Sequence, residues 1–284
     1  MPQITNPAQP APVGKQPKRN PWPSDSGPSG FDVADRFIPA EFATIARHEE
    51  SFWWYRGMRA IQLGVLVPYL EKRRVRRALE AGCGTGYLAR RLQQERNLPL
   101  VAMDYSAQGL RYGMGEGLER ATQGSVFDLP FASATFDLAM SFDVLQQFWP
   151  GEERRALAEL ARVVKPGGLL ALRVSAFRAL RSRHSEFVRE RQRYTRPQLR
   201  RLVEDAGFRI LRATYANTLL SPIALLKFRL VEPLQSKRAE SGIQPEPQWL
   251  DRALYGALAA EAAWLRAGFR LPFGQSLLLI GERI

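Results

Sequence analysis

The stretch ALEAGCGTGYLARRL, residues 78–92, decides the fold. A short apolar run leads into three closely spaced glycines, and a helical pattern follows them. Glycines after a buried strand permit a tight turn and a close approach of backbone to ligand, and the next helix offers unpaired N–H groups. The stretch therefore indicates either a nucleoside-cofactor loop or a plain strand-to-helix turn. Residues 84–89 also fit the loose dinucleotide pattern G-x-G-x-x-A, so two cofactor classes compete at this point.

Outward from this loop, apolar runs alternate with amphipathic helical patterns. Strand-like runs occupy 100–103, 136–142, 169–174, 208–215 and 276–280, and helical patterns occupy 41–70, 87–94, 152–164, 219–234 and 249–267, with a further helix after Ser106. This alternation predicts an α/β fold of the Rossmann-like kind, with a mostly parallel sheet and helices on both faces. Such sheets bind ligands beyond the carboxyl ends of their strands.

Two carboxylates follow at that edge. Asp104 lies 18 residues beyond Gly86, where a carboxylate accepts the ribose hydroxyls of an adenosine ligand. Asp128 suits an exocyclic amine, and Leu129 suits packing against a base. The plainer alternatives are a solvated aspartate ahead of a helix capped by Ser106, and an aspartate in a turn.

Composition narrows the class of protein. The 284 residues carry a net charge of +13, one cysteine (Cys83) and two histidines (His48 and His184). An internal disulfide and a thiolate zinc cluster are excluded, and we expect no metal site. The positive charge favours anionic partners without choosing among them.

Domain boundaries follow from pattern changes. We expect a proline-rich disordered tail over 1–30 and one domain over 31–284. That domain divides into an N-terminal helical cap (31–75), a cofactor-binding core (76–217), a helical lid insertion (218–270) and a final strand (271–284). No stretch predicts a signal peptide or a membrane span, so we expect a cytoplasmic protein.

The ordered motifs resemble the class I S-adenosylmethionine-dependent methyltransferases, and most closely the bacterial type 11 methyltransferase-domain family. The motifs are EAGCGTG (80–86), MDYS (103–106), DLPF (128–131), FDL (136–138) and LARVVKPGG (160–168). The resemblance implies a seven-stranded sheet whose last strand, Gln275 to Glu282, is antiparallel.

The resemblance also implies roles in binding S-adenosyl-L-methionine. The methionine part is expected at Glu80, Gly82, Cys83, Gly84 and Gly86, the ribose at Asp104, and the adenine at Tyr105, Asp128 and Leu129, with Phe142 as a further cofactor-binding residue. Relatives often have Glu-His where this chain has Gln146-Gln147, so any catalytic duty of that histidine is absent here.

Methyl transfer from a sulfonium is an in-line displacement that requires alignment and exclusion of water. His184 is the candidate general base, and its alternative is a surface histidine on a basic helix. The aromatic side chains of Trp53, Trp54 and Tyr55 either close over the cofactor or pack in the core. Arg56 could bind a carboxylate or a phosphate.

The expected activity is methyl transfer to a small, lipophilic acceptor. The apolar stretch 219–231 favours a lipophilic acceptor or contact with a membrane surface. The segment 173–201 contains ten arginines and two glutamates. This excess of positive charge leaves an RNA methyltransferase or an RNA-binding module as an alternative. A non-catalytic protein with the methyltransferase fold and a nicotinamide enzyme also stay open, as does the oligomeric state.

Overall fold

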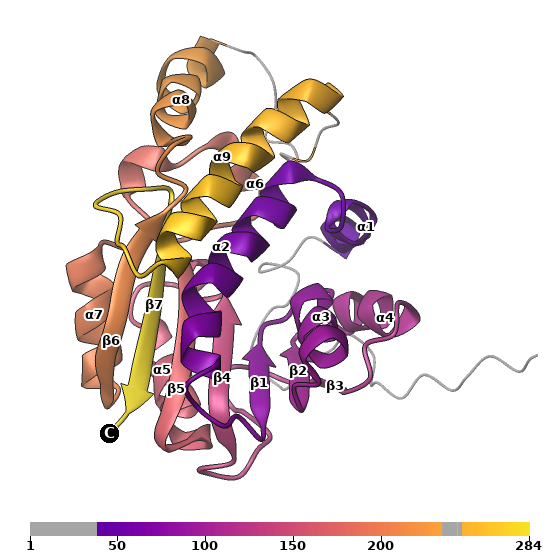
Figure 1. Cartoon of the computed structure of the whole chain (residues 1–284), viewed down its shortest axis with the longest axis vertical. Helices are drawn as coiled ribbons and strands as arrows, with labels where there is room; N and C mark the ends of the chain where they lie inside the picture. Colours follow the sequence, from indigo (N-terminus) through magenta and orange to yellow (C-terminus); the bar gives the residue numbers. More distant parts are fainter. Residues whose placement is uncertain (1–38, 235–242, 244–245) are drawn as a thin grey trace, which may run out of the picture.

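A seven-stranded sheet lies at the centre of the computed structural model, which describes residues 39–234, 243 and 246–284 (Figure 1). The strand order is β3-β2-β1-β4-β5-β7-β6. The strands are β1 (Ala78–Ala81), β2 (Leu100–Asp104), β3 (Ala121–Gln123), β4 (Phe136–Phe142), β5 (Val164–Ser175), β6 (Phe208–Ala216) and β7 (Ser276–Arg283). Neighbouring strands from β3 to β5 pair in parallel, whereas β7 is antiparallel to both β5 and β6. The predicted α/β sheet with an antiparallel last strand is confirmed.

Helices cover both faces of this sheet. They are α1 (Pro39–His48), α2 (Trp53–Leu70), α3 (Tyr87–Arg96), α4 (Ala107–Gly115), α5 (Glu153–Val163), α6 (Arg183–Phe187), α7 (Arg196–Asp205), α8 (Ser221–Leu226) and α9 (Gln248–Arg266). Figure 1 shows α2 and α9 side by side in front of the sheet, with α5 and α7 behind it.

Alternation along the strands explains this two-sided arrangement. On β7, Leu277 and Leu279 belong to the core that α5 and α7 cover, whereas Leu278 and Ile280 belong to the core under α2 and α9. Successive side chains of a strand point to opposite faces, so a continuous apolar run fills two cores at once. The run of buried leucines is therefore a signature of a sheet covered on both sides.

The N-terminal cap differs from its prediction. The pattern over 41–70 predicts one helix, but the chain turns between α1 and α2, where Phe52 is extended with φ −69° and ψ 130°. Within the turn, Glu49 is buried and accepts a hydrogen bond from the Thr85 hydroxyl. The inward-pointing carboxylate explains why the turn lies here. The predicted tail over 1–30 lies outside the described residues.

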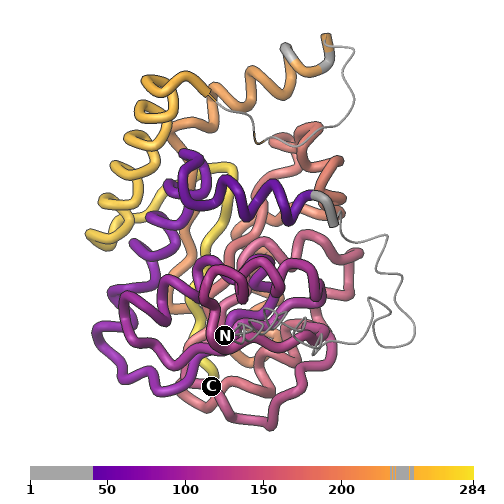
Figure 2. The backbone as a smooth tube through the Cα atoms, turned by 90° about the vertical axis from the view of Figure 1, so that its right-hand side faces the viewer, coloured from indigo at the N-terminus to yellow at the C-terminus, as the bar shows by residue number. Residues whose placement is uncertain are grey.

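Within the segment 218–270, predicted as a lid, α9 packs on α2 of the N-terminal cap. Glycines of α2 allow the close approach of α9: a Cβ added to Gly57 would lie 2.3 Å from Leu258, and one added to Gly64 would lie 2.8 Å from the Ala262 carbonyl oxygen. Helix α9 is therefore a structural cover of the sheet. Figure 2, turned by 90°, shows α8 extending away from the sheet at the same end of the molecule as α9. No helix in the described part of the chain has the length and hydropathy needed to span a bilayer.

Candidate functional site

The loop between β1 and α3 has the geometry that its glycines predict. Gly82, Gly84 and Gly86 adopt φ values of +81°, +59° and +68°, a region that favours glycine. The backbone N–H groups of Gly82 and Cys83 donate to the Met103 carbonyl at 2.7 and 3.0 Å, which fixes the loop to the end of β2. A Cβ added to Gly84 would meet only Phe42, at 3.8 Å, so this glycine borders open space.

Asp104 holds the same loop from the end of β2. Its Oδ2 accepts from the Gly84 backbone N–H at 2.7 Å, and its Oδ1 accepts from the Ser106 N–H at 2.8 Å. Ser106 also caps α4, because its hydroxyl accepts from the Gly109 N–H. Burial raises the pKa of Asp104 to about 6. Gly84 and Asp104, the two positions on which the cofactor prediction depends, therefore share one site.

A cavity of about 340 Å³ lies beyond the carboxyl ends of β1, β2, β4 and β5. The polar part of its lining includes Glu49, Arg59, Glu80, Asp104, Asp143, Gln147 and Arg173. The apolar part includes Phe42, Ile45, Tyr55, Met58, Phe127, Phe142, Phe148 and Val188. The lining thus combines carboxyl groups and glycine backbone with apolar and aromatic side chains, some of which α1 and α2 contribute.

Three buried carboxyl groups, those of Glu49, Glu80 and Asp104, line this cavity. Burial raises the pKa of Glu80 to about 8, with nearby Asp104 adding to the effect, and raises the pKa of Glu49 to about 7. Glu80 Oε2 is buried with no hydrogen-bond partner among the described residues. A buried, unpaired carboxylate oxygen is costly, so the arrangement favours a cationic or hydrogen-bond-donating ligand.

The structure brings most of the predicted cofactor residues to this cavity. Its lining contains Glu80, Gly82, Cys83, Gly84, Asp104, Tyr105 and Phe142. Burial raises the pKa of the Cys83 thiol, which keeps it protonated. Gly86 lies behind the lining as the left-handed residue that precedes α3.

The structure does not bring Asp128, Leu129 or His184 into the cavity lining. Asp128 is exposed and Leu129 is buried in the core with 2% exposure; Ser125 to Phe127, just before them, line the cavity instead. The loop curls back through a hydrogen bond from the Asp128 N–H to the Ser125 carbonyl, which turns the two predicted residues away.

His184 is an exposed residue of α6. Its ring stacks on Phe187 at 6.4 Å between centroids. Val188, one turn further on, lines the cavity.

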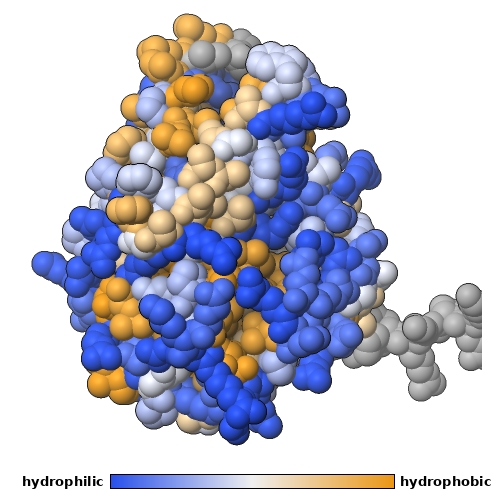
Figure 3. All heavy atoms as spheres, viewed as in Figure 1, coloured by the Kyte–Doolittle hydropathy of each residue, from blue (hydrophilic) through white to orange (hydrophobic). Residues whose placement is uncertain are grey.

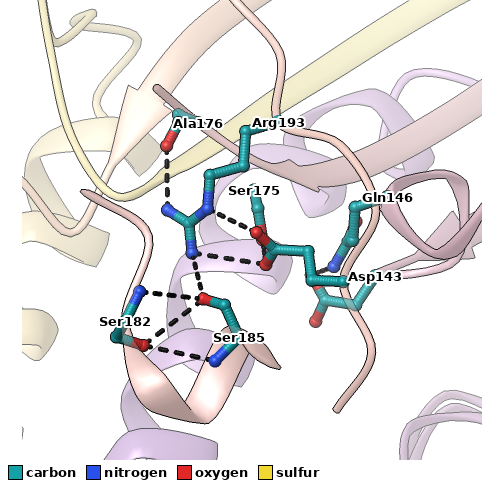
Figure 4. A network of polar contacts seen from close by, with 8 residues as sticks. Asp143, Gln146, Ser175, Ala176, Ser182, Ser185 and Arg193 are labelled. Atoms are coloured by element: carbon teal, nitrogen blue, oxygen red, sulfur yellow. Dashed lines mark hydrogen bonds and ion pairs between the residues drawn. The ribbon is translucent and has the colours of Figure 1, made fainter. Parts of the chain in front are cut away.

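A buried ion pair within the segment that carries α6 makes hydrogen bonds to the end of β5 (Figure 4). Arg193 pairs with Glu190, and their side chains are only 10% and 6% exposed. Arg193 also donates to the Ala176 carbonyl at 3.0 Å and to the Ser185 hydroxyl at 2.8 Å, while Ser175 donates to Glu190 at 2.8 Å. We refer to Arg193, Glu190, Ser175 and Ser185 as the Arg193 clasp. It determines where Val188 meets the cavity.

Sequence reasoning missed several lining residues. Arg173 forms an ion pair with Asp143, and its Nε donates to Asp143 Oδ1 at 3.0 Å. Burial lowers the pKa of Arg173 to about 10. An arginine inside the apolar run 169–174 was the signal that could have found it, because a charge in a buried strand needs a reason. Glu49 and Arg59 had no comparable signal, since their positions depend on the turn between α1 and α2.

Other sequence candidates have structural roles. Tyr55 lines the cavity, whereas Trp53 and Trp54 pack against the core under α2 and α9. Arg56 donates to Asp251 at 3.1 Å. His48 Nδ1 lies 2.9 Å from the Thr44 carbonyl oxygen within α1.

Helix α4 supports the glycine loop through glycines of its own. A Cβ added to Gly113 would lie 2.1 Å from the Thr85 carbonyl oxygen, and one added to Gly109 would lie 2.6 Å from the Gly84 carbonyl oxygen. Gly113→Ala should therefore displace the loop and lower the free energy of unfolding by about 1–3 kcal/mol, measured by urea denaturation. A Cβ at Gly115 would meet nothing within 4 Å, so Gly115→Ala is the matched control and should be neutral or stabilising. Equal losses in both variants would contradict the packing argument.

The comparisons with known proteins agree with this geometry. Residues 79–172 match the family model described as a methyltransferase domain. The malonyl-[acyl-carrier protein] O-methyltransferase of Enterobacter lignolyticus is 31% identical over 140 residues, which cover 49% of this chain and 53% of that protein. The corresponding protein of Pectobacterium atrosepticum is 38% identical over 95 residues, covering 33% of this chain and 36% of that protein. The chain thus spans about half, or less, of the length of these curated relatives.

Solved structures share the fold. A SAM-dependent methyltransferase from Archaeoglobus fulgidus superposes with a TM-score of 0.52 at 16% identity, covering 83% of this chain and 97% of that one. Another from Thermotoga maritima gives a TM-score of 0.51 at 17% identity, covering 87% and 100%.

The sheet order, the glycine loop and the matched model together define a class I S-adenosylmethionine-dependent methyltransferase domain. Within that class, the model that residues 79–172 match is that of the type 11 methyltransferase domain.

Proposed function

We propose that this chain transfers a methyl group from S-adenosyl-L-methionine to a small, lipophilic acceptor bound in the cavity. The observation that carries this proposal is the composition of the cavity lining, which combines buried carboxyl groups and glycine backbone with apolar and aromatic side chains. A charged nucleoside fits the carboxyl groups and glycine backbone, and a lipophilic acceptor fits the apolar and aromatic side chains.

The residues present fit the cofactor. The unpartnered Glu80 Oε2 suits its ammonium group, and Asp104 suits the ribose hydroxyls. Tyr105 and the 125–127 segment suit the adenine, and the open space at Gly84 lets the chain approach closely. When bound, the cofactor supplies a methyl group that positive charge on sulfur has already activated. The protein then has to align the acceptor and exclude water.

For the acceptor, we propose an acid whose carboxylate is methylated on oxygen. The lining contains the cation Arg59 and the ion pair of Arg173 with Asp143, and no histidine is among the lining residues of the described cavity. A carboxylate is a nucleophile without losing a proton, so this acceptor needs no general base. The curated relatives named above are O-methyltransferases, which supports the same class of reaction.

The test incubates the purified full chain with methyl-labelled cofactor and a cell extract, followed by organic extraction. A labelled apolar product supports the proposal, and release of the label as methanol by mild alkali identifies a methyl ester. An alkali-stable product would contradict the carboxylate acceptor. No labelled product with any acceptor would favour the non-catalytic alternative. Thermal protection by a nicotinamide cofactor, but not by S-adenosylhomocysteine, would overturn the cofactor assignment.

The RNA alternative loses support because four of its ten arginines have other partners. Arg173 and Arg193 are in ion pairs in the protein interior, and Arg200 pairs with Glu204 on α7. Arg191 lies over the Trp149 ring at 4.3 Å. Salt-dependent RNA retention in a filter assay would restore this alternative.

The buried carboxyl groups give cofactor binding and stability opposite dependences on pH. The pKa values of Glu80 and Glu49, about 8 and about 7, exceed the ordinary 4.5. A cationic ligand prefers the ionised carboxylates, so titration calorimetry should show affinity rising from pH 6 to 8, by up to about tenfold per unit for one proton.

The stability of the ligand-free protein should fall as the pH rises. Because the folded state keeps protons that the unfolded state releases, these groups stabilise the fold below about pH 4.5, and this stabilisation is lost as the pH rises through about 8. Glu80→Gln should flatten both pH dependences, and an unchanged slope in that variant would contradict the assignment.

A further inference from the structure

A row of apolar side chains faces solvent along the segment that begins just before α8. Leu219, Ile223, Leu226, Leu230 and Leu234 are 55%, 64%, 58%, 59% and 86% exposed. They recur every three or four residues: Leu219 lies just before α8, and the other four lie on the run formed by α8, the π-helix 227–231 and the 3₁₀ turn 232–234. We call these five residues the apolar stripe. Figure 3 shows hydrophobic residues gathered at this end of the molecule, over α8.

Exposed cations border the stripe. Lys227 and Arg229 lie on the same run, and Arg178 and Arg181 lie on the segment after β5 that α8 contacts. The Arg229 Nε donates to the Ala179 carbonyl at 3.1 Å, which holds the two segments together. The acidic residue of the run, Glu232, accepts from the Arg183 N–H at 3.0 Å. We call Arg178, Arg181, Lys227 and Arg229 the basic border.

We propose that the apolar stripe and its basic border dock on the surface of an anionic lipid bilayer. Leucine and isoleucine side chains enter the boundary between headgroups and acyl chains, and the arginine and lysine side chains contact lipid phosphates. The net charge of +13 adds long-range attraction to the same surface.

A bilayer suits this surface better than a second copy of the chain. An isologous contact through the stripe would bring two basic borders together, and like charges across an interface repel. The stripe also lies on a helical run at one end of the molecule (Figure 2), where a flat membrane can reach it.

The surface is connected to the cavity by a short path. The segment from Arg178 onward continues into α6, and Val188 after it lines the cavity. A protein docked by the stripe would hold its cavity close to membrane-dissolved acceptors. The docking itself needs neither cofactor nor acceptor, so it goes beyond the proposed function and can be tested separately.

The experiment is co-sedimentation of the full chain with vesicles of phosphatidylglycerol and phosphatidylcholine in equal parts, and with phosphatidylcholine alone. Binding to the anionic vesicles, weakened at about 0.5 M salt, is the expected result. Leu226→Ser combined with Leu230→Ser should lower the partition coefficient about tenfold or more. The matched control, Met114→Ser with Ile284→Ser, replaces residues 43% and 76% exposed outside the stripe and should bind normally.

A second measurement places the contact without relying on deletion of side chains. Leu230→Cys labelled with an environment-sensitive fluorophore should shift to the blue on anionic vesicles, whereas the same label at Ile284→Cys should not shift. Absence of vesicle binding by the unaltered chain, or equal binding by the stripe and control variants, would overturn the proposal. So would a stripe variant that dissociates a dimer in sedimentation velocity while its vesicle binding stays unchanged.

Discussion

Asp104→Ala should abolish measurable binding of S-adenosylhomocysteine in isothermal titration, with a loss of at least about a hundredfold, or about 3 kcal/mol. The carboxylate faces the cavity and holds the Gly84 N–H at 2.7 Å and the Ser106 N–H at 2.8 Å. Its removal takes away the acceptor for the ribose hydroxyls and releases two points that fix the glycine loop. Both effects act in the same direction.

Two further variants separate these effects. Asp104→Asn keeps one acceptor oxygen and the shape of the side chain, so it should retain the fold in thermal unfolding while binding the ligand weakly. Asp128→Ala changes an exposed aspartate outside the cavity and should leave the dissociation constant unchanged. A normal dissociation constant for Asp104→Ala would show that the residue is misassigned. Loss of S-adenosylhomocysteine binding in Asp128→Ala would show that Asp128 contacts the adenine.

Arg193→Ala should produce the largest loss of stability, about 3–5 kcal/mol in urea unfolding. The substitution leaves Glu190, with 6% side-chain exposure, as an uncompensated buried charge, and it removes the donors to Ala176 and Ser185. Val188 should shift as the segment loosens, so ligand affinity should fall as well.

The control for this prediction is an exposed ion pair. Arg154 and Asp205 are 62% and 58% exposed at 3.1 Å, and Arg154→Ala should cost no more than about 1 kcal/mol. Replacing both members of the buried pair, as Arg193→Met with Glu190→Leu, should recover much of the loss because no lone charge remains. An unfolding midpoint for Arg193→Ala equal to that of Arg154→Ala would contradict the role of the Arg193 clasp.

Local sequence patterns predicted the central sheet well because its strands are apolar on both faces. The run 136–142 became β4 with the same bounds, and the last strand, expected over 275–282, occupies Ser276–Arg283. The break between α1 and α2 was missed, since a turn determined by Glu49 meeting Thr85 depends on residues 36 positions apart. The packing of 218–270 was hard to foresee for a similar reason. Helix α9 packs on glycines of α2 that lie about 200 residues earlier.

Within the site, residues adjacent to strand ends were predictable and the rest were not. Glu80, Gly84 and Asp104 line the cavity because strand topology alone places them at its edge. Asp128 shows where prediction from strand ends fails. The hydrogen bond from its backbone N–H to the Ser125 carbonyl turns the loop so that Asp128 lies outside the cavity lining. Glu49, Arg59 and Arg173 reach the cavity through tertiary packing, which spacing along the chain does not encode.

The close contact between α2 and α9 also bears on how the chain can be divided. The matched region, 79–172, holds the cofactor loop but lacks Tyr55, Met58 and Arg59 of the cavity wall, which stand on α2. Helix α2 in turn rests against Leu258 and Ala262 near the other terminus. A fragment trimmed to the matched region would therefore lose this part of the cavity wall together with β7, whose side chains fill both cores of the sheet. Dividing the chain without opening the cavity would require α2 and α9 to stay in the same piece.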